Sequence, residues 1–141
     1  MKKIALILIF IFNTNLNADT LKDINEIKDL TEKIMTFVGK GETIKGLDLM
    51  SPYLIIPKSE FETTKNQLAM QEPIYKSRFG KTLGVEHIST EEVGESLIKI
   101  IYIHKFEKHV MKWSFYYYKP NDLWILNTFR TIDRIDLLFK T

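Results

Sequence analysis

Proton-transfer chemistry has few candidate residues in this chain. The three histidines are His87, His104 and His109, and Tyr102 lies two positions before His104 in a segment of alternating apolar residues. A histidine or tyrosine that projects into a pocket with a shifted pKa can act as a general acid or base. A small pocket enzyme that uses Tyr102 or His104 is therefore one alternative function.

Such an enzyme also needs a carboxylate on an inward strand position, and the sequence places none there. The nearest carboxylates along the chain, Glu86 and Asp133, fall at the ends of expected strands. Glu86 fits a solvated sheet edge better than a pocket. We expect no catalytic residue.

The histidines also form a poor metal-binding pattern. The chain has no cysteine, which excludes disulfides and thiolate ligands. His104 and His109 flank Glu107-Lys108. A four-residue loop would set the two rings opposite each other, whereas a two-residue turn leaves them offset on one face. We expect the two-residue turn, and no metal or cofactor. His104 is then either a hydrogen-bonding residue at a pocket rim or an ordinary half-buried histidine.

Aromatic side chains are the most suggestive feature. Rings with polar tips on one face can line an apolar pocket for a hydrophobic or ring-bearing ligand. The same rings can instead fill a core beneath helices. Arg78 could clamp an anionic ligand, or lie at the surface beside Glu72 or Glu86. The candidate pocket residues are Tyr75, Arg78, Tyr102, His104, Trp113, Phe115, Tyr117 and Trp124.

The elements that must position these rings begin with helices. Apolar residues recur every three or four positions over 21–37, which predicts an amphipathic helix. We expect Thr20 as its N-cap and Gly39 and Gly41 at its end. A short second helix is predicted over residues 43–50.

A third helix is predicted from the capping-box pair Ser59 and Glu62 to Phe79, with Gly80 ending it. Pro73 falls inside this segment. Because proline lacks an N–H and clashes with the preceding turn, it should kink or split the helix.

After residue 80 the apolar period changes to two, which predicts strands. Short turn segments separate them, so the sheet should be antiparallel. Helices followed by a sheet indicate an α+β fold with the N-terminal helices packed on one face of the sheet. The predicted strands are Val85–Ser89, Glu95–Phe106, Val110–Tyr118 and Leu123–Thr131.

A two-residue turn at Glu107-Lys108 fixes the register of the central hairpin. It pairs Tyr102 with Trp113 and gathers the apolar side chains on one face, while lysines occupy the other. The first and third helices should cover the apolar face. If Tyr118 pairs with Leu123, three further residues join that face: Trp124, Leu126 and Thr128.

The opposite face is expected to carry its own apolar cluster. Such a cluster favours a homodimer formed sheet against sheet. Two alternatives remain open: a β-bulge that turns some of these residues inward, or a C-terminal tail over 132–139 that covers them. The candidate interface residues are Tyr116, Tyr118, Ile125 and Phe129.

The N-terminus predicts export. Lys2 and Lys3 precede an apolar run over 4–12, and a short polar stretch ends at Ala18, the order of a secretory signal peptide. We expect cleavage near Ala18, a single domain over 19–141 and a periplasmic or secreted location. An uncleaved anchor is the alternative, although nine apolar residues are too few for a permanent span, which needs about 20.

Charge argues against nucleic acid as a partner. Without the two leader lysines, eighteen basic side chains balance eighteen acidic ones, and no basic face is evident. We expect a small apolar ligand, an envelope protein or a second copy of the chain as partner.

The sequence also resembles the nuclear transport factor 2-like superfamily, and its uncharacterised exported members more than its enzymes. The resemblance covers about residues 21–139 and is carried by the element order, by Tyr75…Arg78-Phe79-Gly80 and by the 113–124 hairpin. It implies a cone-like curved sheet with a pocket beneath the helices. We therefore expect a non-enzymatic binding module, with an acid–base enzyme or a structural accessory protein of the envelope as alternatives.

Overall fold

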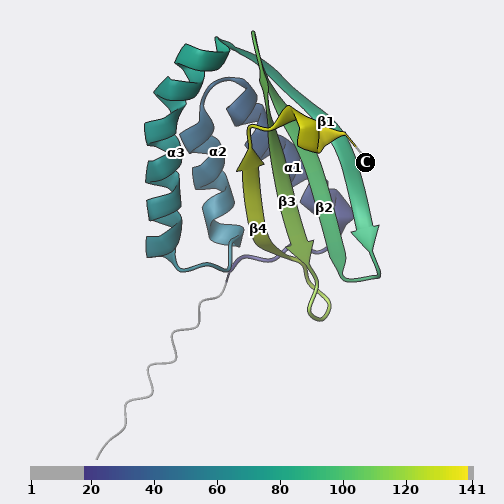
Figure 1. Cartoon of the computed structure of the whole chain (residues 1–141). Coiled ribbons are helices and arrows are strands. Elements are labelled where there is room, and N and C mark those ends of the chain that lie inside the picture. Colours follow the sequence, from purple (N-terminus) through teal and green to yellow (C-terminus); the bar gives the residue numbers. More distant parts are fainter. Residues whose placement is uncertain (1–17, 140–141) are drawn as a thin grey trace, which may run out of the picture.

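The computed structural model describes residues 18–139, so the predicted leader over 1–17 lies outside the described residues. The fold is α+β, with helices first and a four-stranded curved antiparallel sheet after them (Figure 1). The helical elements are α1 (Ile24–Gly39), α2 (Thr43–Met50), η1 (Ser51–Tyr53), α3 (Lys58–Phe79) and η2 (Ile135–Leu138). The strands are β1 (Thr82–Val93), β2 (Leu97–Phe106), β3 (Val110–Tyr118) and β4 (Ile125–Ile132).

The strands pair in chain order, β1-β2-β3-β4. Tyr102 pairs with Trp113 and Ile98 with Tyr117, and the Phe106 amide donates to the His109 carbonyl at 2.8 Å. The register predicted from the two-residue turn is therefore confirmed. Strand β1 is longer than predicted at both ends, because it pairs with β2 along nearly its whole length.

The β3–β4 connection differs from the prediction. Tyr118 pairs with Ile125 rather than with Leu123, so the loop is longer than expected. A β-bulge then shifts the register, and Tyr116 pairs with Thr128 while Phe115 pairs with Phe129. Since paired residues share a face, the bulge turns Phe129 inward and Thr128 outward.

Phe129 therefore belongs to the inner face: the alternative of a β-bulge is confirmed for this residue, and its candidate place at an outer interface is wrong. Its ring lies 6.3 Å from that of Trp113 and 6.5 Å from that of Phe61 on α3. The predicted inward position of Thr128 is wrong for the same reason.

Helix α1 begins at Asp23 rather than at Thr20. The Asp23 carboxylate accepts hydrogen bonds from the Asn25 and Glu26 amides at 2.8 and 3.0 Å, which satisfies two amides that have no helical partner. A stripe of its side chains is then buried at helical spacing, including Ile27 and Ile34.

Helix α3 also departs from the prediction. Its N-cap is Pro57, Ser59 lies inside the helix, and no side chain caps the N-terminus. The helix runs through Pro73 without a break and ends at Gly80.

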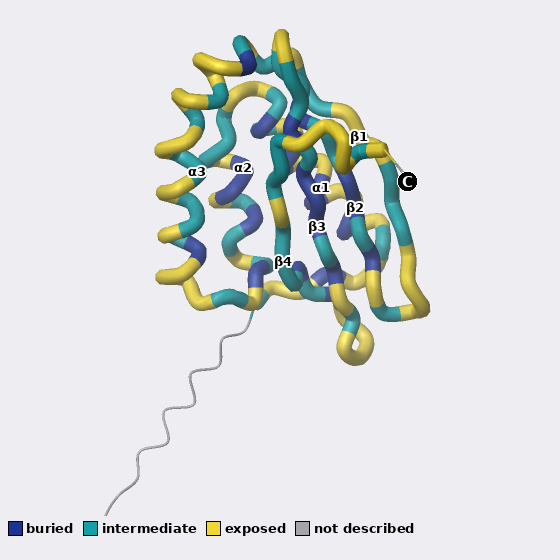
Figure 2. Tube along the Cα trace, viewed as in Figure 1, coloured by how far each residue is buried: buried dark blue, intermediate teal, exposed yellow. Residues whose placement is uncertain are grey.

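The helices cover the inner face unequally. Figure 1 shows α1 behind the sheet and α3 alongside it, and Figure 2 shows that most of α3 is exposed. Phe61 and Phe79 are its buried residues, whereas α1 and α2 supply most of the helical core. The predicted cover by the first helix is thus confirmed, whereas α2 contributes more to the core than predicted and α3 contributes less. Within residues 18–139, none of the helices has the length and apolarity needed to cross a bilayer.

Candidate functional site

One end of the space between the helices and the sheet is filled. Phe115, Tyr117 and Leu126 are fully buried there. The Tyr117 hydroxyl lies 2.7 Å from that of Thr31, which in turn donates to the Ile27 carbonyl at 2.7 Å. Burial raises the pKa of Tyr117, so its phenol stays protonated. These residues form core, with their polar atoms satisfied.

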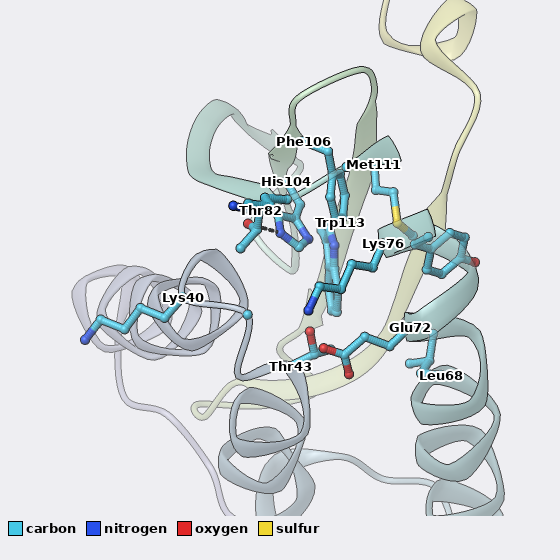
Figure 3. Close-up of a pocket in the computed structure, with 14 residues that line it drawn as sticks. Lys40, Thr43, Leu68, Glu72, Lys76, Thr82, His104, Phe106, Met111 and Trp113 are labelled. Carbon is cyan, nitrogen blue, oxygen red and sulfur yellow. Dashed lines mark hydrogen bonds between the residues drawn. The ribbon is translucent and has the colours of Figure 1, made fainter. Parts of the chain in front are cut away.

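The other end is hollow and contains a cavity of about 410 Å³. Its walls come from the α1–α2 junction, the C-terminal half of α3, the start of β1 and the turn end of the β2–β3 hairpin. This volume lies within the roughly 300–1,000 Å³ typical of small-molecule sites. Figure 3 shows Trp113 and Phe106 standing along the sheet side of the cavity.

The cavity exists because α3 cannot pack down along its length. Leu68, Glu72 and Tyr75 follow one another at helical spacing on the side of α3 that lines the cavity, and Lys76 lies beside them. Burying the carboxylate or the ammonium without a partner would be costly. The helix is therefore fixed by Phe61 and Phe79 near its two ends and leaves space between them.

The hairpin tip fixes the back of the cavity. The Glu107 carboxylate accepts a hydrogen bond from the Lys81 amide at 2.9 Å, and the Lys108 amide donates to the Phe79 carbonyl at 2.9 Å. A Cβ on Gly80, whose φ is +86°, would lie 2.3 Å from that carboxylate. Glycine at this position allows the chain to turn from α3 into β1 directly beneath the hairpin.

His104 lies in the cavity lining and is 5% exposed. Its Nε2 lies 2.6 Å from the Thr82 hydroxyl, and its ring centroid lies 4.1 Å from that of Phe106, with the two rings tilted by 38°. Desolvation lowers the pKa of His104 to about 4, so the imidazole is neutral near pH 7. Among the described residues no carboxylate hydrogen-bonds to His104 or to Tyr102. This arrangement suits hydrogen bonding better than acid–base chemistry.

Trp113 is the second distinctive residue of the cavity. It is 2% exposed, and its indole N–H is the one buried side-chain polar atom without a hydrogen-bond partner in the part of the chain that the structure describes. An unmade hydrogen bond of this kind costs about 1–3 kcal/mol. No acceptor within residues 18–139 meets this donor.

The structure brings together some of the predicted pocket residues. Tyr75, His104 and Trp113 line the cavity. Arg78 is exposed and lies over the Phe79 ring at 5.3 Å. Four others lie outside the lining: Tyr102, Phe115, Tyr117 and Trp124.

Of these four, Tyr102 and Trp124 have neighbours of their own. The Tyr102 ring contacts that of His87 at 5.2 Å, and burial raises the pKa of its hydroxyl. The Trp124 backbone pairs with Leu21, and the Lys119 ammonium lies over its ring at 5.2 Å.

Sequence reasoning missed the helical wall of the cavity. Leu68, Glu72 and Lys76 from α3 and Thr43 from α2 belong to the lining. A signal was available, because the spacing of Leu68, Glu72 and Tyr75 places a charged residue on the side of α3 that should face the core. Such a mixed stripe indicates a helix that borders a cavity or solvent.

On the outer face, Tyr116, Tyr118 and Ile125 lie toward the open end of β3, as predicted. Tyr118 is 38% exposed, and Leu97 beside it is 47% exposed. A depression of about 380 Å³ lies at this place. The segment η2 crosses the outer face at the other end of β3 (Figure 1), where the Lys112 ammonium donates to the Leu137 carbonyl at 3.3 Å. The tail therefore leaves the tyrosines uncovered.

Within residues 18–139 there is no cluster of three or more histidine or carboxylate side chains that could hold a metal ion. Comparison with known proteins finds no match among protein-family models, curated proteins or solved structures.

Proposed function

We propose that this chain is an exported, non-enzymatic binding module whose cavity takes a small molecule with an apolar body. The observation that carries the proposal is the cavity of about 410 Å³ between α3 and the sheet, with an aromatic wall and an unsatisfied indole donor. A protein that only filled its own interior would not leave such space beside a satisfied core.

Two further inferences belong to this proposal. Export is supported by the leader pattern at residues 2–18. Membership of the nuclear transport factor 2-like superfamily is supported by the order of helices and sheet and by the sheet's curvature. Association of two copies through Tyr116, Tyr118 and Ile125 stays a prediction, and Phe129 is no longer part of it.

Binding is favoured over catalysis by the surroundings of His104. A pocket base needs a pKa near the working pH, whereas desolvation lowers that of His104 to about 4. Its hydrogen-bond partner is the Thr82 hydroxyl. The imidazole is thus held as a neutral polar group at the cavity wall.

The test is a titration with a neutral apolar fluorophore, N-phenyl-1-naphthylamine, monitored by fluorescence. Native mass spectrometry counts the bound molecules per chain. We expect one saturable site per chain in the full chain expressed with its leader. Leu68→Trp, which fills the cavity, should abolish the binding. Met70→Trp adds the same ring at a position of α3 that is 76% exposed, and should leave it intact.

Two outcomes would contradict the proposal. One is the absence of saturable binding to the unsubstituted chain. The other is equal binding to Leu68→Trp and Met70→Trp, which would place the fluorophore outside the cavity.

A further inference from the structure

The charged groups along the cavity are mainly cationic. Three lysines, Lys40, Lys76 and Lys81, line it against a single carboxylate, Glu72. None of these lysines forms an ion pair within the described part of the chain. The cavity therefore has an excess of positive charge at its walls.

The orientation of the lysine side chains reduces the number of cations that can contact a ligand. In Figure 3 the ammonium of Lys40 points away from the cavity, so only its stem contributes, whereas Lys76 and Glu72 both extend from α3 toward Thr43. Lys81 is exposed and lies at the start of β1, next to Thr82. Lys76 and Lys81 are thus the two remaining cations of the lining.

Helix α2 brings its N-terminus to the cavity wall, together with the carboxylate of Glu42, which forms an ion pair with Lys45 at 2.8 Å. It begins at Thr43 on the cavity wall, and its N-cap Glu42 makes no side-chain cap hydrogen bond. The first amides of a helix have no helical acceptors and carry the positive end of its dipole.

Trp113 belongs to the cavity lining. Its N–H is a donor that no group of the described chain accepts. His104 adds no charge, since burial lowers its pKa and its Nε2 already meets Thr82. The indole nitrogen itself is buried within the wall, so the charges of the lining, rather than this donor, favour a ligand with a negative group.

We propose that the ligand is an amphipathic organic anion. Its apolar body lies against Trp113 and Phe106, and its acidic group, a carboxylate or an equivalent oxyanion, lies beside Lys76 and Lys81. This assignment rests on the proposed binding function and deepens it by naming the class of ligand.

The test compares two probes that differ by one charged group. N-Phenyl-1-naphthylamine is neutral, and 1-anilinonaphthalene-8-sulfonate has the same rings with a sulfonate. For the full chain we expect the anionic probe to bind about tenfold more tightly, at one site lost in Leu68→Trp. Added salt should weaken the binding of the anion alone, because it screens exposed charges.

Two double variants locate the charge effect. Lys76→Gln with Lys81→Gln should remove the preference for the anion and leave the affinity for the neutral probe unchanged. Lys28→Gln with Lys58→Gln makes the same change in net charge at two exposed lysines outside the lining, and should keep the preference.

Each outcome separates the two proposals. If both probes bind the cavity equally well, the anion assignment is overturned and the binding function stands. If the preference survives Lys76→Gln with Lys81→Gln, the assignment is also overturned, because another group then recognises the charge. If neither probe binds, the binding function itself fails.

Discussion

The inner face of the sheet runs beneath the helices from a packed end to a hollow end, and the same two central strands cross both. At the packed end Phe115 and Tyr117 meet α1, whose inward residues are apolar apart from Thr31. At the hollow end the cavity separates Trp113 and His104 from α3, whose lining residues include the half-buried Glu72 and the exposed Lys76.

The difference lies in what the helices contribute. The alternation of apolar residues along β2 and β3 makes the inner face of the sheet largely apolar at both ends. Because the charged residues of α3 are costly to bury without partners, the helix lies farther from the sheet where they occur. The cavity therefore depends on the sequence of α3 more than on that of the sheet.

The largest effect should come from the same truncation made at each end. Leu126→Ala removes a fully buried side chain at the packed end and should cost about 2–5 kcal/mol of unfolding free energy. Leu68→Ala removes atoms that already border the cavity, and should cost about 1 kcal/mol or less. Urea unfolding of both variants measures the two costs.

Equal costs would break the comparison. A large loss from Leu68→Ala would mean that α3 packs onto the sheet and that the cavity is closed in solution. A small loss from Leu126→Ala would mean that the packed end relaxes into the space that the truncation leaves.

The central hairpin could be predicted from sequence because two independent constraints agree. The Glu107-Lys108 turn and the alternation that pairs Tyr102 with Trp113 require the same register, and a slip by one residue would bury lysines. The order of elements follows from the same change of period near residue 80.

The errors fall where local patterns permit two solutions. Around Asn127 the chain reads as a regular strand, yet a bulge there lets Phe129 pack against Phe61, a contact that only the tertiary structure supplies. Thr20 and Asp23 are both competent N-caps, and hydrogen bonds to two amides select Asp23.

The predicted site was partly right about the sheet, and on α3 it included Tyr75 but none of Leu68, Glu72 and Lys76. Tyr75, His104 and Trp113 line the cavity, while Phe115 and Tyr117 lie in the packed end. Alternation along a strand shows which face of the sheet a ring occupies. It does not show where along the strand the covering helix separates from the sheet. That position depends on Glu72 and Lys76, which precede Glu107 at the hairpin tip by 35 and 31 residues.

The second prediction uses the pKa of His104 to locate the boundary between the packed end and the hollow end. Its pKa falls from 6.5 unfolded to about 4 folded, so between these values the unfolded chain binds a proton that the folded chain does not. Stability should be unaffected by this group above pH 6.5 and should fall as the pH drops from 6.5 to 4, by about 3 kcal/mol.

The measurement is the difference between the urea stabilities of the unsubstituted chain and His104→Gln across this range. Taking the difference cancels the contribution of the carboxylates to the free energy of unfolding, because both proteins contain them. His87→Gln is the matched control and should keep the full pH dependence. A difference that stays constant with pH would mean that water in the cavity solvates the imidazole, so the hollow end would extend past His104.

The smallest effect tests whether the packed end is dry. Tyr117→Phe removes one hydroxyl and should cost about 1 kcal/mol, since Thr31 still donates to the Ile27 carbonyl. Thr31→Val should cost more, because it leaves the buried phenol of Tyr117 without its acceptor. The double variant should cost less than the sum of the two, since the hydroxyls form one network. If Tyr117→Phe has no effect on urea unfolding and the two costs simply add, water reaches both hydroxyls. The packed end would then be as open as the cavity, and the contrast between the two ends would disappear.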